Sequence, residues 1–323
     1  MPHSADAARL VTPTMLVLWL ALASAPLWID AVGLYPYLGI EILIWSIYAL
    51  AFNLVLGTSG LVSFGHGAYF GVGAYAFGLA QFNLSANLWI CLGAATLAAG
   101  LAGLFVGLFI SHRRGIYYAF MTIAFGQIFW TIAIKAYGLT GGEDGLLNIA
   151  RLPADFGVVS FDISGNLGLY YFVLAVFVMV VVALWRLVHS PYGRVLAAIR
   201  QSETRAAHLG YPVWRYKLTV FALSAAVSGL AGGLFAMAQR SAFPDVMSVN
   251  QSGLIVMMTL VGGGLVSFWG PVIGVVTFLI ARDVIGALTF AWMIYFGLLF
   301  MAIVLFRPEG IAGMVRPLLA RWR

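Results

Sequence analysis

Residues 190–217 read SPYGRVLAAIRQSETRAAHLGYPVWRYK and form a polar, basic island between two long apolar segments. The island has one acidic residue, Glu203, against five basic residues: Arg194, Arg200, Arg205, Arg215 and Lys217. A polar stretch between two membrane-length segments lies in water, and an excess of Lys and Arg is typical of cytoplasmic loops. We therefore predict a membrane protein whose cytoplasmic side is marked by this island.

The island also carries the end signals of a helix. Ser190 suits the N-cap, Pro191 suits the first helical position, and Gly210 suits the residue just past the end. The sequence predicts one helix of roughly five turns over residues 190–210, with an apolar stripe. That stripe consists of Leu196, Ile199, Ala206 and Leu209. Two interpretations stay open: a helix that rests on the membrane or on its own chain, and a helix that docks a cytoplasmic partner.

Composition places the whole chain in the membrane. Of its 323 residues, 63% are hydrophobic and 9% are charged, whereas a soluble domain has about 25% charged residues. We predict an all-α, polytopic integral membrane protein, with residues 1–323 as one transmembrane domain of about 8–10 helices. The net charge of +6 follows from the side of the membrane that holds the Lys and Arg residues, so no nucleic acid is expected. Cys91 is the single cysteine, which excludes an intramolecular disulfide.

Hydropathy and charge give the expected order of spans. With the N-terminus and the C-terminus both cytoplasmic, most Lys and Arg residues fall inside, including the turn at Arg113 and Arg114 and the C-terminal arginines. The expected apolar segments are 14–29, 38–56, 60–78, 89–110, 115–137, 168–188, 218–239, 253–282 and 284–306. The longest polar outer loop, 138–166, suits contact with an extracytoplasmic partner.

Segment 253–282 is interrupted by a glycine-rich stretch, and its two pieces are each shorter than an ordinary span. The topology requires it to enter and return, as a re-entrant hairpin or as two short helices. The sequence GLVSF occurs at residues 60–64 and again at 264–268, each time beside a glycine-rich break. Two repeated halves that meet at broken helices are typical of transporters. We expect the solute pathway to be lined by the third and fifth spans and by the 253–282 hairpin.

Polar residues in the spans supply the candidates for that pathway. Gln127, Thr131 and Lys135 recur every four residues and therefore share one helix face. Intramembrane polar groups usually face the protein interior or a water-filled path. His66 has a second interpretation, a packed and hydrogen-bonded core residue. The predicted pathway residues are Asn53, Ser63, His66, Thr122, Gln127, Thr131 and Ser267.

The chain shows no energy source of its own. Lys135 and Lys217 are its only lysines, and neither stands in the Gly-Lys-Ser/Thr context of a phosphate-binding loop. We expect no ATPase site, no other enzyme activity, no cofactor and no metal. The alternatives are a self-sufficient channel or secondary transporter, and a subunit that a partner drives. Paired glycines such as Gly67 and Gly71 favour close contact between helices and, we predict, a permease dimer.

Several motifs resemble those of the branched-chain amino-acid permeases of ABC importers, in particular the LivM-like branch. They are SGLVSFGHGAYFGVGAYA (59–76), RRGIYYAFMTIAFGQ (113–127), TGGEDGL (140–146), SPYGRVLAAIRQSETRAAHLGY (190–211) and RPEGIAG (307–313). The resemblance implies a bacterial inner-membrane importer with two permease subunits, two ATP-binding cassette subunits and a periplasmic substrate-binding protein. The second permease is expected to be a related but different subunit, which makes a heterodimer, and membrane lipid surrounds the pair.

The resemblance also makes 190–217 a cytoplasmic coupling loop that contains a coupling helix. The residues expected to couple the chain to the ATPases are Gly193, Arg194, Ile199, Arg200, Glu203, Leu209 and Gly210. The substrate stays open: branched-chain amino acids or a related small polar solute, or, in other relatives, urea, amides or aromatic acids.

Overall fold

A computed structural model describes residues 22, 24, 26, 35, 37–155, 160–289, 291–306 and 309–313. Almost all of the regular structure in this part of the chain is α-helical, which confirms the predicted all-α, polytopic membrane architecture. The exception is a two-residue antiparallel pair in the outer loop, β1 (Ala154–Asp155) with β2 (Ser160–Phe161).

Six of the described helices are long and apolar enough to cross a membrane. They are α2 (Tyr37–Asn53) continued by the π-helical turn η3 (Leu54–Thr58), α4 (Leu88–Ile110), α5 (Gly115–Lys135), α7 (Asn166–His189), α10 (Val213–Gln239) and α12 (Gly270–Leu288). Three further helices lie among them, namely α3 (His66–Asn83), α11 (Val249–Gly262) and α13 (Trp292–Phe306). The remaining short pieces are α6 (Tyr137–Thr140), η4 (Gly142–Asp144), α8 (Pro191–Gln201), α9 (Glu203–His208) and η5 (Pro244–Met247).

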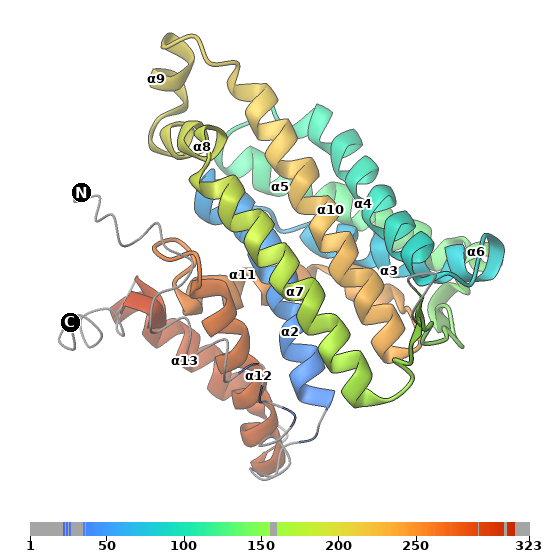
Figure 1. Cartoon of the computed structure of the whole chain (residues 1–323). Helices are drawn as coiled ribbons and strands as arrows, with labels where there is room; N and C mark the ends of the chain where they lie inside the picture. The colour runs from blue at the N-terminus through green and yellow to red at the C-terminus, as the bar shows by residue number, and fades with distance from the viewer. Residues whose placement is uncertain are drawn as a thin grey trace.

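Helix α2 forms the centre of the bundle (Figure 1). Its membrane window is wholly buried, because α7 and α10 cover one side and α11 and α12 cover another. An apolar helix buried on all sides is one that other helices enclose instead of lipid. Position 14–29, the predicted first span, lies largely outside the described residues, although the Leu22 carbonyl accepts a hydrogen bond from the Tyr170 hydroxyl of α7.

Helices α3, α4 and α10 pack closely through small residues. A Cβ on Gly232 of α10 would lie 1.8 Å from the Phe70 carbonyl of α3, and one on Gly103 of α4 would lie 2.3 Å from Ala225 Cβ. Backbones therefore approach at distances that only glycine allows, as is common between membrane helices. This packing holds α3 and the segment before it in place.

The predicted hairpin at 253–282 is present, but its second arm is longer than expected. Helix α11 and helix α12 pack against each other across a turn at 263–269. Helix α12 continues to Leu288, where the sequence analysis started the last span at 284; that span begins instead with α13 at Trp292. The charged pair Arg282 and Asp283 suggested a boundary there, but Arg282 pairs with Glu41 and Asp283, so the helix continues through both residues.

The single helix predicted over 190–210 is wrong: the structure has two. Ser202 has extended backbone angles (φ −165°, ψ 108°), ends α8 and caps α9 by accepting a hydrogen bond from the Arg205 N–H. Serine competes well for this role because its hydroxyl satisfies an N–H that the helix start leaves unpaired. The break turns α9 away from α8, as Figure 1 shows at the top of the bundle.

Candidate functional site

Helix α8 is the amphipathic helix that directly follows α7 and begins the 190–217 loop. The Ser190 hydroxyl caps it by accepting from the Gly193 N–H at 3.3 Å, and Pro191 occupies the first turn, as predicted. Gly193 sits at the α7–α8 corner, where a Cβ would lie 2.0 Å from the Val188 carbonyl. Glycine is therefore required for the corner itself, which fixes the direction in which α8 leaves the membrane.

One face of α8 packs inward. Leu196 and Ile199 are buried in the chain's own core, and Ala206 of α9 is buried as well. Ile199 therefore offers no side chain to a partner in this structure, contrary to its expected place in a docking stripe. Leu209 differs: it is 76% exposed, so it lies off the buried stripe and is available for contact. Gly210 has a φ of +86°, which explains the glycine at the end of α9.

The Arg200 side chain reaches from α8 to both glycine-rich breaks. Its guanidinium donates to the Gly57 carbonyl in η3 and to the Leu265 carbonyl at 3.2 Å. Its methylene stem covers Gly60, where a Cβ would lie 2.8 Å from Arg200 Cγ and where φ is +72°. Arg200 therefore joins the first GLVSF segment and the second one.

The two breaks touch each other beside Arg200. A Cβ on Gly57 would lie 2.7 Å from the Gly264 carbonyl, so the backbones meet directly. The Asn53 side chain is only 7% exposed, and its Oδ1 is wedged against both glycines. Among the described residues this oxygen has no hydrogen-bond partner. Buried polar atoms are almost always paired, so this contact leaves an acceptor unsatisfied.

A cavity of about 700 Å³ opens next to this contact. It lies between η3, α8 and the 264–268 segment, and it includes Asn53 and Ser267 from the predicted pathway with Gly193, Arg194 and Arg200 from the predicted coupling set. The sequence predicted a solute pathway and a separate ATPase-coupling site. The structure brings residues of both sets to one cavity at one end of the bundle.

Three other predicted pathway residues lie in the protein interior. His66 is fully buried, with Nδ1 3.1 Å from Ser63 Oγ and Nε2 2.8 Å from Ser224 Oγ. Its ring also meets the edges of aromatic rings on three sides. The second interpretation of His66, a hydrogen-bonded core residue, therefore describes this structure.

Thr122 is buried too, and it holds the first break against α5. Its hydroxyl accepts from the Phe64 N–H at 3.1 Å and donates to the Ala119 carbonyl at 2.6 Å. A Cβ on Gly65 would lie 1.9 Å from the Thr122 carbonyl. Ser63, His66 and Thr122 are thus the supports of the 60–65 segment.

Gln127 and Thr131 share a half-buried face of α5, and neither residue lines the cavity beside Arg200. The same helix exposes a row of large apolar side chains, namely Ile116, Tyr117, Phe120, Ile128 and Ile132. The predicted role of Gln127 and Thr131 in the pathway stays a prediction.

An ion cluster that no sequence pattern indicated joins the loop segments at the α8–α9 end of the bundle. Glu203 Oε1 lies 3.1 Å from Lys217 Nζ, and Glu203 Oε2 lies 2.7 Å from Arg114 Nε. Lys217 is only 1% exposed and also donates to the Arg113 carbonyl at 2.5 Å. The cluster joins α9, the first turn of α10 and the α4–α5 turn. The position of Lys217 in the predicted basic island gave no sign that it is buried.

A second ion pair lies toward the opposite end of α2. Arg282 of α12 donates through both terminal nitrogens to the two oxygens of Glu41, each at 2.9 Å. Arg282 also donates to the Tyr35 hydroxyl at 3.3 Å. Burial, with a smaller effect of the Glu41 charge, raises the pKa of Tyr35 to about 12, so this phenol stays neutral. The pair fixes α12 to α2.

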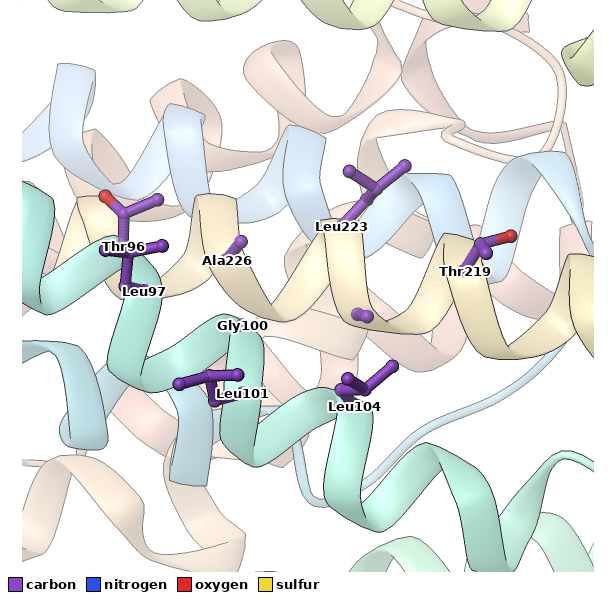
Figure 2. A pocket seen from close by; sticks show the side chains of 9 residues that line it. Thr96, Leu97, Gly100, Leu101, Leu104, Thr219, Leu223 and Ala226 are labelled. Atoms are coloured by element: carbon purple, nitrogen blue, oxygen red, sulfur yellow. The ribbon is translucent and has the colours of Figure 1, made fainter.

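The α4–α10 pair also has a lateral groove of about 420 Å³ (Figure 2). Figure 2 shows Leu97, Leu101, Leu104 and Leu223 around the small residues Gly100 and Ala226. Its lining has no charged residue. The groove shares no lining residue with the cavity beside Arg200.

Comparisons with known proteins agree with this architecture. The family model for the permease component of branched-chain amino acid transport systems matches residues 37–306. The high-affinity branched-chain amino acid transport system permease proteins LivM of Salmonella typhimurium and of Escherichia coli are each 30% identical to the chain, over 85% of the chain and 69% of the relative. A probable branched-chain amino acid transport permease LivM of Methanocaldococcus jannaschii is 23% identical, over 84% of the chain and 92% of the relative.

No solved structure matches the chain. The family match covers both GLVSF segments, α8, the Glu203 cluster and the Arg282 pair. On this evidence the chain belongs to the family of permease components of branched-chain amino acid transport systems.

Proposed function

We propose that this chain carries branched-chain amino acids inward across the bacterial inner membrane, as one of two permease subunits that separate ATPase subunits drive. The observation that carries the proposal is the way in which α8 packs on the rest of the chain. One face of the helix packs on the chain, while Arg194, Ala197 and Ala198 remain exposed. A rigid helix of this kind can pass a movement of a cytoplasmic partner to the membrane domain, because the chain holds it at both ends. Gly193 packs against α7 near its start, and Arg200 donates to the breaks near its end.

The sidedness of the proposal rests on what gathers around α8. The Arg113–Arg114 turn is joined to α9 through Glu203, and residues 309–313 pack on the second break, where a Cβ on Gly310 would lie 2.4 Å from the Gly263 nitrogen. The basic Arg113–Arg114 turn belongs in the cytoplasm by the positive-inside rule, and so do the arginines that flank residues 309–313 in the sequence. We therefore place both termini there. Labelling of Arg205→Cys from the cytoplasmic side only, and of Leu147→Cys from the outer side only, would agree with this orientation; the reverse pattern would refute it.

The nucleotide chemistry in this proposal belongs to the partners. The two ATP-binding subunits would contact α8 and α9, with Leu209 as an exposed apolar contact. The outer segment 138–166 would meet the periplasmic binding protein. The second permease, which we propose to be a different subunit, would cover exposed apolar faces such as that of α5. One copy of each permease in the purified complex is the expected stoichiometry.

Uptake by the reconstituted complex tests the function. Proteoliposomes with the chain, its second permease, the ATPases and the binding protein should accumulate labelled leucine, isoleucine or valine, and vanadate should abolish accumulation. The matched control omits only the binding protein. Uptake that proceeds without ATP would identify a channel or secondary transporter, and uptake of urea or an aromatic acid in place of leucine would refute the proposed substrate.

The proposed pathway face is tested separately. Gln127→Cys and Thr131→Cys should react with water-soluble thiol reagents in at least one transport state. Ile128→Cys on the exposed apolar face of α5 serves as the matched comparison. Protection of Gln127→Cys and Thr131→Cys in every state would remove this face from the pathway.

A further inference from the structure

We propose that the contact between Gly57 and Gly264 is a cytoplasmic gate, and that Arg200 is the positioning residue that keeps it closed and links it to α8. The inference deepens the proposed function and rests on it. One side chain, that of Arg200, connects the two breaks. Arg200 touches Gly57, Gly60 and Leu265, which belong to two breaks that are far apart in sequence.

Arginine is suited to this contact. Its planar guanidinium presents several N–H groups in a fixed fork, so one side chain can satisfy carbonyls on two segments. Both acceptors are backbone carbonyls, and each lies where helical hydrogen bonding is interrupted. Arg200 thus adds a polar link between two breaks that are otherwise held by the packing of Gly57, Gly264 and Asn53 and of the helices that carry them.

The Asn53 side chain lies inside the closed contact. Asn53 Oδ1 is buried between Gly57 and Gly264 and has no hydrogen-bond partner among the described residues. Asn53 also lines the cavity beside the contact, so separation of the two glycines would widen the access of solvent to this side chain. The donations from Arg200 favour the closed arrangement, and their loss would favour the open one.

The cavity beside the contact gives the gate an outlet. It is lined by Gly57 and Gly264 themselves and by α8 residues, so movement of α8 changes its wall directly. A shift of α8 by an ATPase would withdraw Arg200 from Gly57 or from Leu265. Solute would then leave between the two GLVSF segments into this space.

Cysteine accessibility tests the gate. The reporter is Asn53→Cys in a chain whose only native cysteine is replaced (Cys91→Ser), assembled with its ATPases. The probe is a water-soluble maleimide added from the cytoplasmic side. In the resting complex the reporter should react slowly, and vanadate trapping should raise its rate at least tenfold. Equal protection in the resting and vanadate-trapped complexes would overturn the proposal, whatever the variants below do.

Arg200→Gln tests the clamp, with Arg186→Gln as the matched control at an exposed position near the end of α7. Arg200→Gln should raise labelling of the resting complex about tenfold and should let ATP hydrolysis proceed without substrate, whereas Arg186→Gln should change neither. Arg200→Lys keeps the charge and most of the stem but lacks the fork, so its labelling rate should fall between those of wild type and Arg200→Gln.

Three outcomes would overturn the role of Arg200. The first is an Arg200→Gln complex with wild-type labelling and wild-type coupling. The second is loss of the ATPases from an otherwise intact chain, which would make Arg200 a docking residue. The third is an Arg200→Lys complex indistinguishable from wild type. A wild-type complex that labels as expected but accumulates no branched-chain amino acid would instead refute the proposed function and leave the gate standing.

Discussion

Removal of the Glu203 carboxylate should loosen the end of the bundle that α9, the start of α10 and the α4–α5 turn form. Lys217 is almost completely buried, and its ammonium has three described partners, namely Glu203, the Arg113 carbonyl and the Tyr118 ring, whose centroid lies 5.7 Å away. In Glu203→Ala the ammonium stays buried and keeps only the carbonyl and the ring. The variant therefore leaves a charge without its counterion, which is the costly way to break an ion pair.

The expected cost is about 3 kcal/mol. Removing one partner of a buried pair typically costs about 3–5 kcal/mol, and the lower end applies because the Arg113 carbonyl still accepts from Lys217. The second pair, with Arg114, adds less than about 1 kcal/mol because the Arg114 side chain is 60% exposed. A loss of about 3 kcal/mol raises the population of the locally open state by about 100-fold.

Hydrogen exchange measures this opening directly. Amides of α9 and of the first turn of α10 should exchange about 100-fold faster in Glu203→Ala, while Glu143→Ala, an exposed acidic residue of the outer segment, should leave them unchanged. The double variant Glu203→Ala with Lys217→Met removes the orphaned charge, so its exchange should return to within about tenfold of wild type. Acceleration below about threefold in the single variant, or no recovery in the double variant, would refute this account of the cluster.

Three further changes have defined outcomes. Gly232→Ala, whose Cβ would lie 1.8 Å from a carbonyl of α3, should lower the thermal stability of the detergent-solubilised chain, whereas Gly93→Ala, which meets nothing within 4 Å, should be neutral; equal melting temperatures would contradict the packing of α3 on α10. Arg282→Gln should destabilise the chain, and the charge exchange Arg282→Glu with Glu41→Arg should recover part of the loss in the same melting assay; a double variant no better than the single one would speak against the pair. Ala198→Pro, in the interior of α8, should cost about 3 kcal/mol of helix stability and abolish uptake while the chain still inserts; normal uptake would exclude a rigid α8 from coupling.

Hydropathy, caps and charge predicted most of the architecture because each acts locally. The Ser190 cap, Pro191 and the in-and-out course of α11 and α12 were all readable from neighbouring residues. The break at Ser202 was readable as well, since a serine followed by an acidic residue is a common helix start. It was missed because the stronger end signal at Gly210 suggested a single long helix.

The ion pairs were not predictable in this way. Glu41 and Arg282 are 241 positions apart, and the residues around each of them do not indicate which partner it pairs with. Lys217 stood in a run of basic residues that suggested exposure, yet helix packing buries it. Such pairs depend on how α2, α9, α10 and α12 are arranged, and one sequence without relatives does not contain that information.

Arg200 is the instructive case, because its sequence position did carry a signal. It follows Leu196 by four residues and adjoins Ile199, so all three lie on one face of α8. Leu196 and Ile199 are buried, whereas Arg200 beside them stays exposed while its guanidinium donates to two carbonyls at the breaks. Its register on the helix pointed to this contact within the chain, and the predicted contact of Arg200 with an ATPase stays a prediction. If an ATPase moves α8, an arginine that contacts both breaks would pass that movement to them directly.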